Sequence, residues 1–130
     1  DGLAIRYASA SPDQEKLQAE VTEILEKECA AAKAADVQTW NRYSDEFHLV
    51  FYRYCNNSRL AESAERLRSG ISIFYNQYCR ETVIQTRIDE EHLAIFQAYK
   101  DGDIEKVVQM MKTHLNDSLN YALRFLPKTF

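Results

Sequence analysis

The chain has 130 residues, the size of a single domain with one hydrophobic core, so we treat residues 1–130 as one domain. Only 3 Gly and 2 Pro interrupt it, a composition typical of long helices joined by short turns, and an all-α class is expected. The formal net charge is −4 and no Lys/Arg cluster occurs, which excludes the basic surface that DNA-backbone binding requires. No apolar run approaches the ~18 residues that span a bilayer, so we expect a cytoplasmic domain without a membrane contact.

The first helices are predicted from capping residues and apolar spacing. The opening residues, around Arg6, look like the tail of a helix already under way. Ser11 and Pro12, with Gln14 as capping-box partner, predict that the next helix starts at residue 12, and it should continue to about residue 33. Its apolar residues recur at helical spacing: Leu17, Val21, Ile24, Leu25 and Cys29.

A helix rich in aromatic residues follows, and Asp36 is predicted to cap it. Its stripe is Trp40, Tyr43, Phe47, Val50, Phe51 and Tyr54. We interpret this stripe as core rather than as a cofactor site. Asn56, Asn57 and Ser58 favour turns and caps, so the helix should end there.

The next helix is expected to begin near Arg59 and to continue through residues 71–75, despite the strand propensity of that run. Its predicted core positions are Leu60, Ala64, Leu67, Ile71 and Phe74 or Tyr75. Residues 79–87 are predicted to form a loop or a distorted turn.

Two further helices complete the prediction. One runs from about Asp89 to Lys100 and ends at Gly102, a residue suited to a left-handed cap. Asp103 then caps the last helix, which Pro127 stops. The apolar side of this helix is formed by Val107, Met111, Leu115, Leu119 and Ala122 or Leu123.

The chain has 3 Cys and 3 His. Cys29, Cys55 and Cys79 are odd in number and lack CxxC spacing, which is typical of reduced thiols in a cytosolic protein. The histidines fall on three different predicted helices and on their interior faces, where a lone imidazole needs a partner. Three imidazoles from separate elements can surround one Zn, Ni, Cu or Fe ion, so His48, His92 and His114 are candidate ligands.

Two aspartates stand three residues before a histidine. Asp45 precedes His48, and its carboxylate can reach the same ion or act as a solvated or supporting residue. Asp89 precedes His92, and for Asp89 the role of helix cap is favoured.

A set of short motifs resembles one known family. The motifs are Phe47-His48, Asn57, Arg59-Leu60, Glu90-Glu91-His92, Gly102-Asp103 and His114-Leu115. Together, from about Ser11 to Leu123, they are similar to the FCD effector domain, the C-terminal domain of the FadR subgroup of GntR-type transcription regulators. The resemblance implies an antiparallel bundle of six or seven helices, here about six with the first helix truncated.

The resemblance also implies a metal ion held by one Asp and three His, with a small carboxylate effector at or beside it. By position, His48, His92 and His114 are the imidazole ligands of a divalent ion, for which zinc is predicted and nickel is an alternative. The position of the family's aspartate is occupied by Ser44. Asp45, a water molecule or the effector itself is left to fill the fourth position, and Asp45 is our prediction.

Arg66 and Arg68 are candidates for binding the effector carboxylate through paired hydrogen bonds, and exposed surface arginines are the alternative. Asn57 and Ser44 are further candidate effector contacts. The winged helix-turn-helix that precedes this domain in the family is missing here, so DNA contact is expected only through that absent module. The resemblance also implies a homodimer.

Three functional hypotheses remain open. The first is a non-enzymatic sensor, in which effector binding at the metal shifts helices and controls DNA binding by the intact protein. The second is an enzyme with a dinuclear metal bundle built on the Asp45/His48 and Asp89/His92 pairs. It is weaker because His114 has Met111 rather than a carboxylate three residues before it. The third is a metal-free interaction module with structural histidines.

Overall fold

A computed structural model describes residues 1–78 and 80–124, with the backbone alone for residues 73–78 and 122. Six helices and no strand occur in these ranges, which confirms the all-α prediction. Their bounds are α1 Gly2–Ser9, α2 Gln14–Lys33, α3 Val37–Arg53, α4 Ser58–Tyr78, α5 Thr82–Lys100 and α6 Ile104–Leu123. Among the described helices, none is long and apolar enough to cross a membrane.

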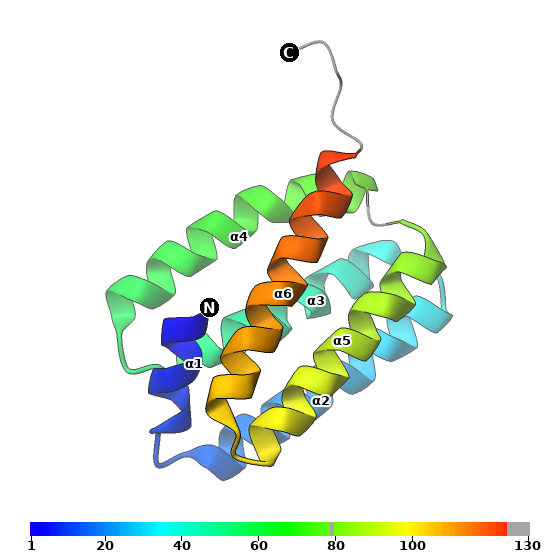
Figure 1. Cartoon of the computed structure of the whole chain (residues 1–130). Coiled ribbons are helices and arrows are strands. Elements are labelled where there is room, and N and C mark those ends of the chain that lie inside the picture. The colour runs from blue at the N-terminus through cyan, green and yellow to red at the C-terminus, as the bar shows by residue number, and fades with distance from the viewer. Residues whose placement is uncertain (79, 125–130) are drawn as a thin grey trace.

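The helices form a bundle around α3 (Figure 1). Helices α2, α3 and α4 pack in sequence, and each reverses the direction of the one before it. The α5–α6 pair lies in front of this row, with α5 against α2, while short α1 packs on α6 and α3. Because α3 contacts α1, α2, α4 and α5, its aromatic stripe lies in the interior.

The core confirms most of the predicted apolar faces. Its buried centre comes from α1, α2, α3, α5 and α6: Ile5, Leu17, Val21, Phe47, Val50, Phe51, Ile95, Val107 and Met111. Trp40 belongs to a second, smaller cluster with Ala31, Ala32 and Ile88. The α3 stripe is therefore core at these positions, as predicted.

Several predicted helix ends are confirmed by their hydrogen bonds. Asp36 Oδ1 accepts the backbone N–H of Thr39 at 3.2 Å, so it caps α3. Asp103 Oδ1 accepts the N–H of Lys106 at 3.2 Å at the start of α6. Gly102 has a φ of +81°, the left-handed conformation expected after α5. The turn between α3 and α4 occurs at the predicted residues.

Two predicted helix starts and one predicted cap are wrong. Helix α2 begins at Gln14 rather than residue 12, because the Ser11 hydroxyl accepts the N–H of Asp13 and Gln14 binds the carbonyls of Ala8 and Ser11. Helix α5 begins at Thr82, so residues 82–87 are helical rather than a loop, whereas residue 79 lies outside the described part. Asp89 consequently lies inside α5 and is not a helix cap. Burial of Ile88 and Gln85 in the bundle outweighs the weak helix propensity of this segment.

Some predicted core positions face outward instead. Leu67 on α4 is 68% exposed and Ile71 is 40% exposed, while Leu119 and Leu123 on α6 are 55% and 51% exposed. For Leu67 and Ile71 the reason is that, among the described residues, α4 packs chiefly on α3, which leaves these side chains on its other face. Cys29 and Cys55 are free thiols, as predicted. The predictions for Cys79, Phe74, Tyr75, Ala122 and Pro127 concern side chains or residues outside the described part.

Candidate metal centre

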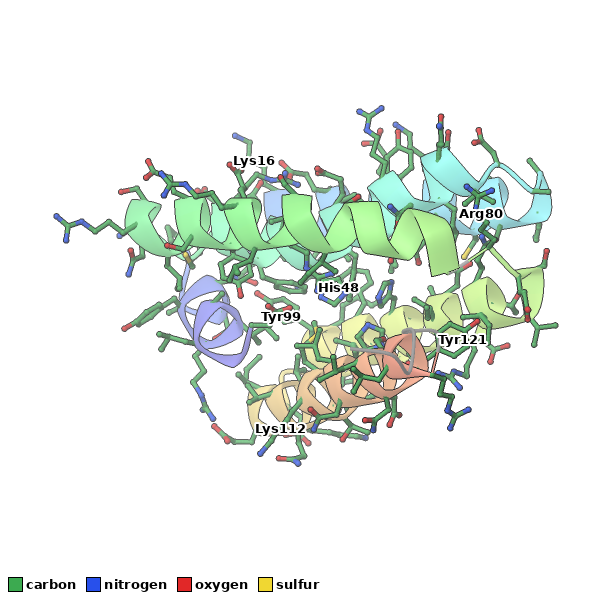
Figure 2. All side chains as sticks on the ribbon, turned by 90° about the horizontal axis from the view of Figure 1, so that it is seen from above. Lys16, His48, Arg80, Tyr99, Lys112 and Tyr121 are labelled. Atoms are coloured by element: carbon green, nitrogen blue, oxygen red, sulfur yellow. The ribbon has the colours of Figure 1, made fainter. Side chains whose placement is uncertain are left out.

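The three histidines meet in the interior of the bundle. His48 comes from α3, His92 from α5 and His114 from α6, and their side chains are 2%, 0% and 4% exposed. Seen from above, His48 lies between the α3–α4 side and the α6 side of the bundle (Figure 2). The Nε2 atoms of His92 and His114 are 3.0 Å apart, and those of His114 and His48 are 3.4 Å apart. One ligand atom of each ring lies within 4.8 Å of the others.

Packing explains why the rings converge. His92 shares the buried face of α5 with Ile95 and Tyr99, as its spacing predicts. The ring of Phe47 stacks on the ring of His92 with centroids 4.1 Å apart, and it lies edge-on to His48. The aromatic stripe of α3 therefore holds two of the three imidazoles in place.

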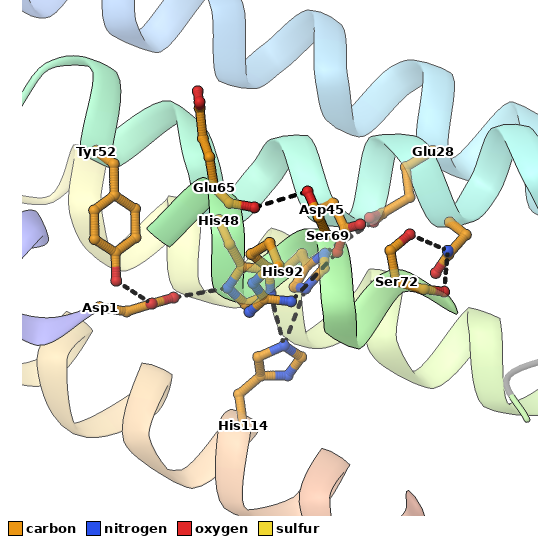
Figure 3. A network of polar contacts seen from close by, with 12 residues as sticks. Asp1, Glu28, Asp45, His48, Tyr52, Glu65, Ser69, Ser72, His92 and His114 are labelled. Carbon is orange, nitrogen blue, oxygen red and sulfur yellow. Dashed lines mark hydrogen bonds and ion pairs between the residues drawn. The ribbon is translucent and has the colours of Figure 1, made fainter. Parts of the chain in front are cut away.

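Each imidazole has a carboxylate on its other nitrogen, and Figure 3 shows the contacts of His48 with Asp1 and of His92 with Glu28. Nδ1 of His48 lies 2.9 Å from Asp1, Nδ1 of His92 lies 3.0 Å from both oxygens of Glu28, and Nδ1 of His114 lies 2.8 Å from Glu91. An ionised carboxylate accepts hydrogen bonds, so these contacts favour the tautomer with the proton on Nδ1. The lone pair of each Nε2 is then directed at the common centre, the arrangement in which histidine binds metals.

The electrostatics of the cluster favour a cation at its centre. Burial holds the pKa values of His48 and His92 well below the usual value, and the neighbouring charges of Arg68 and the other histidines act in the same direction. Neutral imidazoles that direct lone pairs at one another repel unless a cation lies among them. Nitrogens at ~2.0–2.1 Å from a tetrahedral ion are roughly 3.3–3.4 Å apart, which agrees with the 3.4 Å between His114 and His48 and is slightly more than the 3.0 Å between His92 and His114. The residues present therefore fit a transition-metal ion of the zinc class.

The structure separates the two candidates for the fourth ligand. Ser44 lies beside the histidines, where it lines a cavity of about 20 Å³ together with His48, His114 and Arg68. Asp45 lies outside the histidine cluster, and its Oδ1 is 3.4 Å from Nη1 of Arg68. Burial raises the pKa of the Asp45 carboxyl, and Arg68 opposes that shift. The role of Asp45 as a ligand stays a prediction.

The other predicted effector residues lie in different places. Arg68 is 12% exposed and reaches the cavity, so the structure brings it together with the histidines. Arg66 is exposed on α4 and is not among the residues that line this cavity. Asn57 caps α4, because its Oδ1 accepts the N–H of Leu60 at 3.1 Å, and it lines a separate surface pocket with Tyr7.

A buried carboxyl pair behind His92 was not predicted from the sequence. Burial raises the pKa of Glu28 to about 7, and burial together with the neighbouring Glu28 raises the pKa of Asp89 to about 8. The two side chains share a hydrogen bond, and the indole N–H of Trp40 donates to Asp89 at 2.8 Å. The available signal was an acidic residue on the apolar face of α2, four residues after Ile24. Neither Asp45 nor Asp89 joins the cluster as the dinuclear hypothesis requires.

The described residues contain no other group of three or more His, Cys, Asp or Glu side chains close enough to hold an ion.

The FCD domain family model matches residues 1–117, which is most of the chain. Neither the curated proteins nor the solved structures compared with the chain include a match. The helical bundle, the cluster of three histidines and this match agree with one another. The chain therefore belongs to the FCD domain family, whose members are ligand-sensing domains of transcription regulators.

Proposed function

We propose that this domain holds one divalent metal ion on His48, His92 and His114 and senses a small carboxylate at that ion. The observation that carries the proposal is the convergence of three buried Nε2 atoms, each with its Nδ1 bonded to a carboxylate. Zinc is the ion we expect, since three neutral imidazoles are a common ligand set for it, and nickel suits the same set. The ion supplies a positive charge that attracts an anionic oxygen.

The cavity beside the histidines is the proposed effector site. Its volume of about 20 Å³ holds about one water molecule. Arg68, His48 and His114 all line this cavity, so a carboxylate bound in it would contact both the guanidinium and the ion. Ser44 leaves space at the position where an aspartate would supply the fourth ligand. Asp45 is paired with Arg68. In this proposal its carboxylate competes with the effector for Arg68 or for the ion.

The small volume also suggests how a signal arises. An organic acid is larger than one water molecule, so its entry requires displacement of the surrounding helices. Arg68 is on α4, which packs chiefly on α3, so a shift of α4 would disturb mainly that one interface. We propose that effector binding shifts α4 and that, in an intact regulator, this shift controls DNA binding.

The effector site is tested by replacing Arg68. We expect Arg68→Gln to weaken acetate binding to the zinc-loaded domain by at least tenfold, since a hydrogen bond to a charged group contributes about 1.5–3 kcal/mol. Arg66→Gln is the matched control on the same helix, and it should bind acetate like the unmodified domain. Isothermal titration calorimetry measures both. Equal affinities in the two variants would remove Arg68 from the site.

We also propose that two copies of the domain pair in solution. The support is the exposed apolar side chains on α4 and α6, named above as Leu67, Ile71, Leu119 and Leu123. A symmetric pair would match the two-fold operators that dimeric regulators bind. Sedimentation equilibrium is expected to give twice the chain mass of 15.1 kDa at high micromolar concentration. A single species at 15.1 kDa would contradict this proposal.

A further inference from the structure

We infer that Glu28 is a positioning residue, which fixes the ring orientation and the proton position of His92 for metal binding. This inference rests on the proposed metal site. Glu28 is on α2, a helix that carries none of the three histidines, and it lies 64 residues away from His92 in the sequence. Both of its oxygens lie 3.0 Å from Nδ1 of His92.

The burial of Glu28 needs an explanation. Its side chain is 0% exposed and occupies a position on the apolar face of α2, between Leu25 and Ala32. A buried acidic group is costly unless other groups satisfy it by hydrogen bonding. Here the described partners are His92 and Asp89. The Glu28 carboxyl group therefore interacts with the His92 ring and not with a charged group at the surface.

Glu28 differs from the other two carboxylates at the cluster. Asp1 is 13% exposed and also accepts the hydroxyl of Tyr52, and Glu91 is 26% exposed and also lies 3.7 Å from Arg87. These carboxylates can exchange their histidine for water or for another partner. Glu28 is enclosed by protein on all sides.

A chain of hydrogen bonds holds Glu28 in turn. The indole of Trp40 donates to Asp89, Asp89 is hydrogen-bonded to Glu28, and Glu28 accepts from His92. Phe47 stacks on the face of the His92 ring, so that ring is fixed both in its plane and along its edge. With Nδ1 tied to Glu28, the lone pair on Nε2 remains available to an ion.

Without Glu28, His92 is free to carry its proton on Nε2, and in that form Nε2 has no lone pair to offer the ion at the cluster. Removing a carboxylate that supports a metal-binding histidine weakens metal binding by about 10–100-fold. We therefore expect Glu28→Ala to bind zinc about 10–100-fold more weakly than the unmodified domain. Glu28→Gln should rescue binding to within about threefold, because its amide oxygen can accept from Nδ1 and its amide N–H can donate to Asp89. Glu20→Ala is the matched control on the same helix, since its carboxylate accepts Tyr54 rather than a histidine.

Two measurements test this role. The first is zinc affinity by competition with a chelator, for the unmodified domain and the three variants. The second is the ¹⁵N spectrum of the His92 ring in metal-free protein, which reports the nitrogen that carries the proton. We expect the Nδ1–H form in the unmodified domain and in Glu28→Gln, and a loss of that form in Glu28→Ala.

The outcomes separate this inference from the proposed function. If the unmodified domain binds no zinc, the metal site is wrong, and the ring spectra alone then decide whether Glu28 orients His92. If Glu28→Ala keeps both the zinc affinity and the Nδ1–H form, Glu28 is not a positioning residue. A purely structural role would lower the thermal stability of Glu28→Ala without changing either readout, and this too would overturn the inference.

Discussion

Replacing His92 by alanine is expected to abolish zinc binding while the domain stays folded. The variant leaves two imidazoles, and a site of this class needs at least three protein ligands to hold its ion tightly. The fold should persist because its core is built from apolar side chains of five helices and needs no metal. Elemental analysis after dialysis should give about one zinc per chain for the unmodified domain and none for His92→Ala, with far-UV circular dichroism still helical.

The same result is expected for His48→Ala and His114→Ala, since all three rings contribute one nitrogen each. Thr113→Ala is the matched control, because Thr113 is exposed on α6 next to His114. Full retention of zinc by any of the histidine variants would remove that histidine from the site. Loss of helical signal together with zinc would show that the metal supports the fold.

The largest loss of stability is expected for Phe47→Ala. Phe47 is fully buried, stacks on His92 and packs edge-on against Phe51. Truncation of a buried phenylalanine leaves a cavity and lowers the free energy of unfolding by about 3–5 kcal/mol. Urea denaturation of the metal-free domain, with a chelator present, measures this change without any contribution from bound zinc.

Leu67→Ala provides the comparison for Phe47→Ala. Leu67 is 68% exposed on α4, so its truncation should change the free energy of unfolding by less than about 0.5 kcal/mol in the monomer. The experiment is therefore done at low protein concentration, where the proposed pairing through this face does not contribute. A loss below about 1 kcal/mol for Phe47→Ala would show that α3 is not the centre of the core.

The sequence was sufficient for the fold where local signals and the final packing agree. Asp36 and Asp103 have the side chains of good caps, Gly102 has the freedom to adopt a positive φ, and each was predicted correctly. Helix α5 began earlier than predicted because the burial of Gln85 and Ile88, a tertiary effect, stabilises its first turns. Leu67 was predicted to be core because helical periodicity does not reveal whether a neighbour covers that face.

The candidate site was predictable only in part. The interior faces of His48, His92 and His114 follow from helical spacing, and the structure confirms that these faces are buried. Glu28 was missed because its partner is 64 residues away, and no periodicity connects α2 with α5. A charged residue on an otherwise apolar helix face is the feature that would have identified it.

Zinc stoichiometry of the unmodified domain tests the central claim most directly. The metal-free domain is titrated with zinc near neutral pH, and binding is followed by calorimetry and checked by elemental analysis after dialysis. The claim that His48, His92 and His114 form one site predicts saturation at about one zinc per chain, and the Nε2 signals of all three rings should shift together. Saturation at two ions per chain, no binding at all, or a shift of fewer than three rings would contradict it.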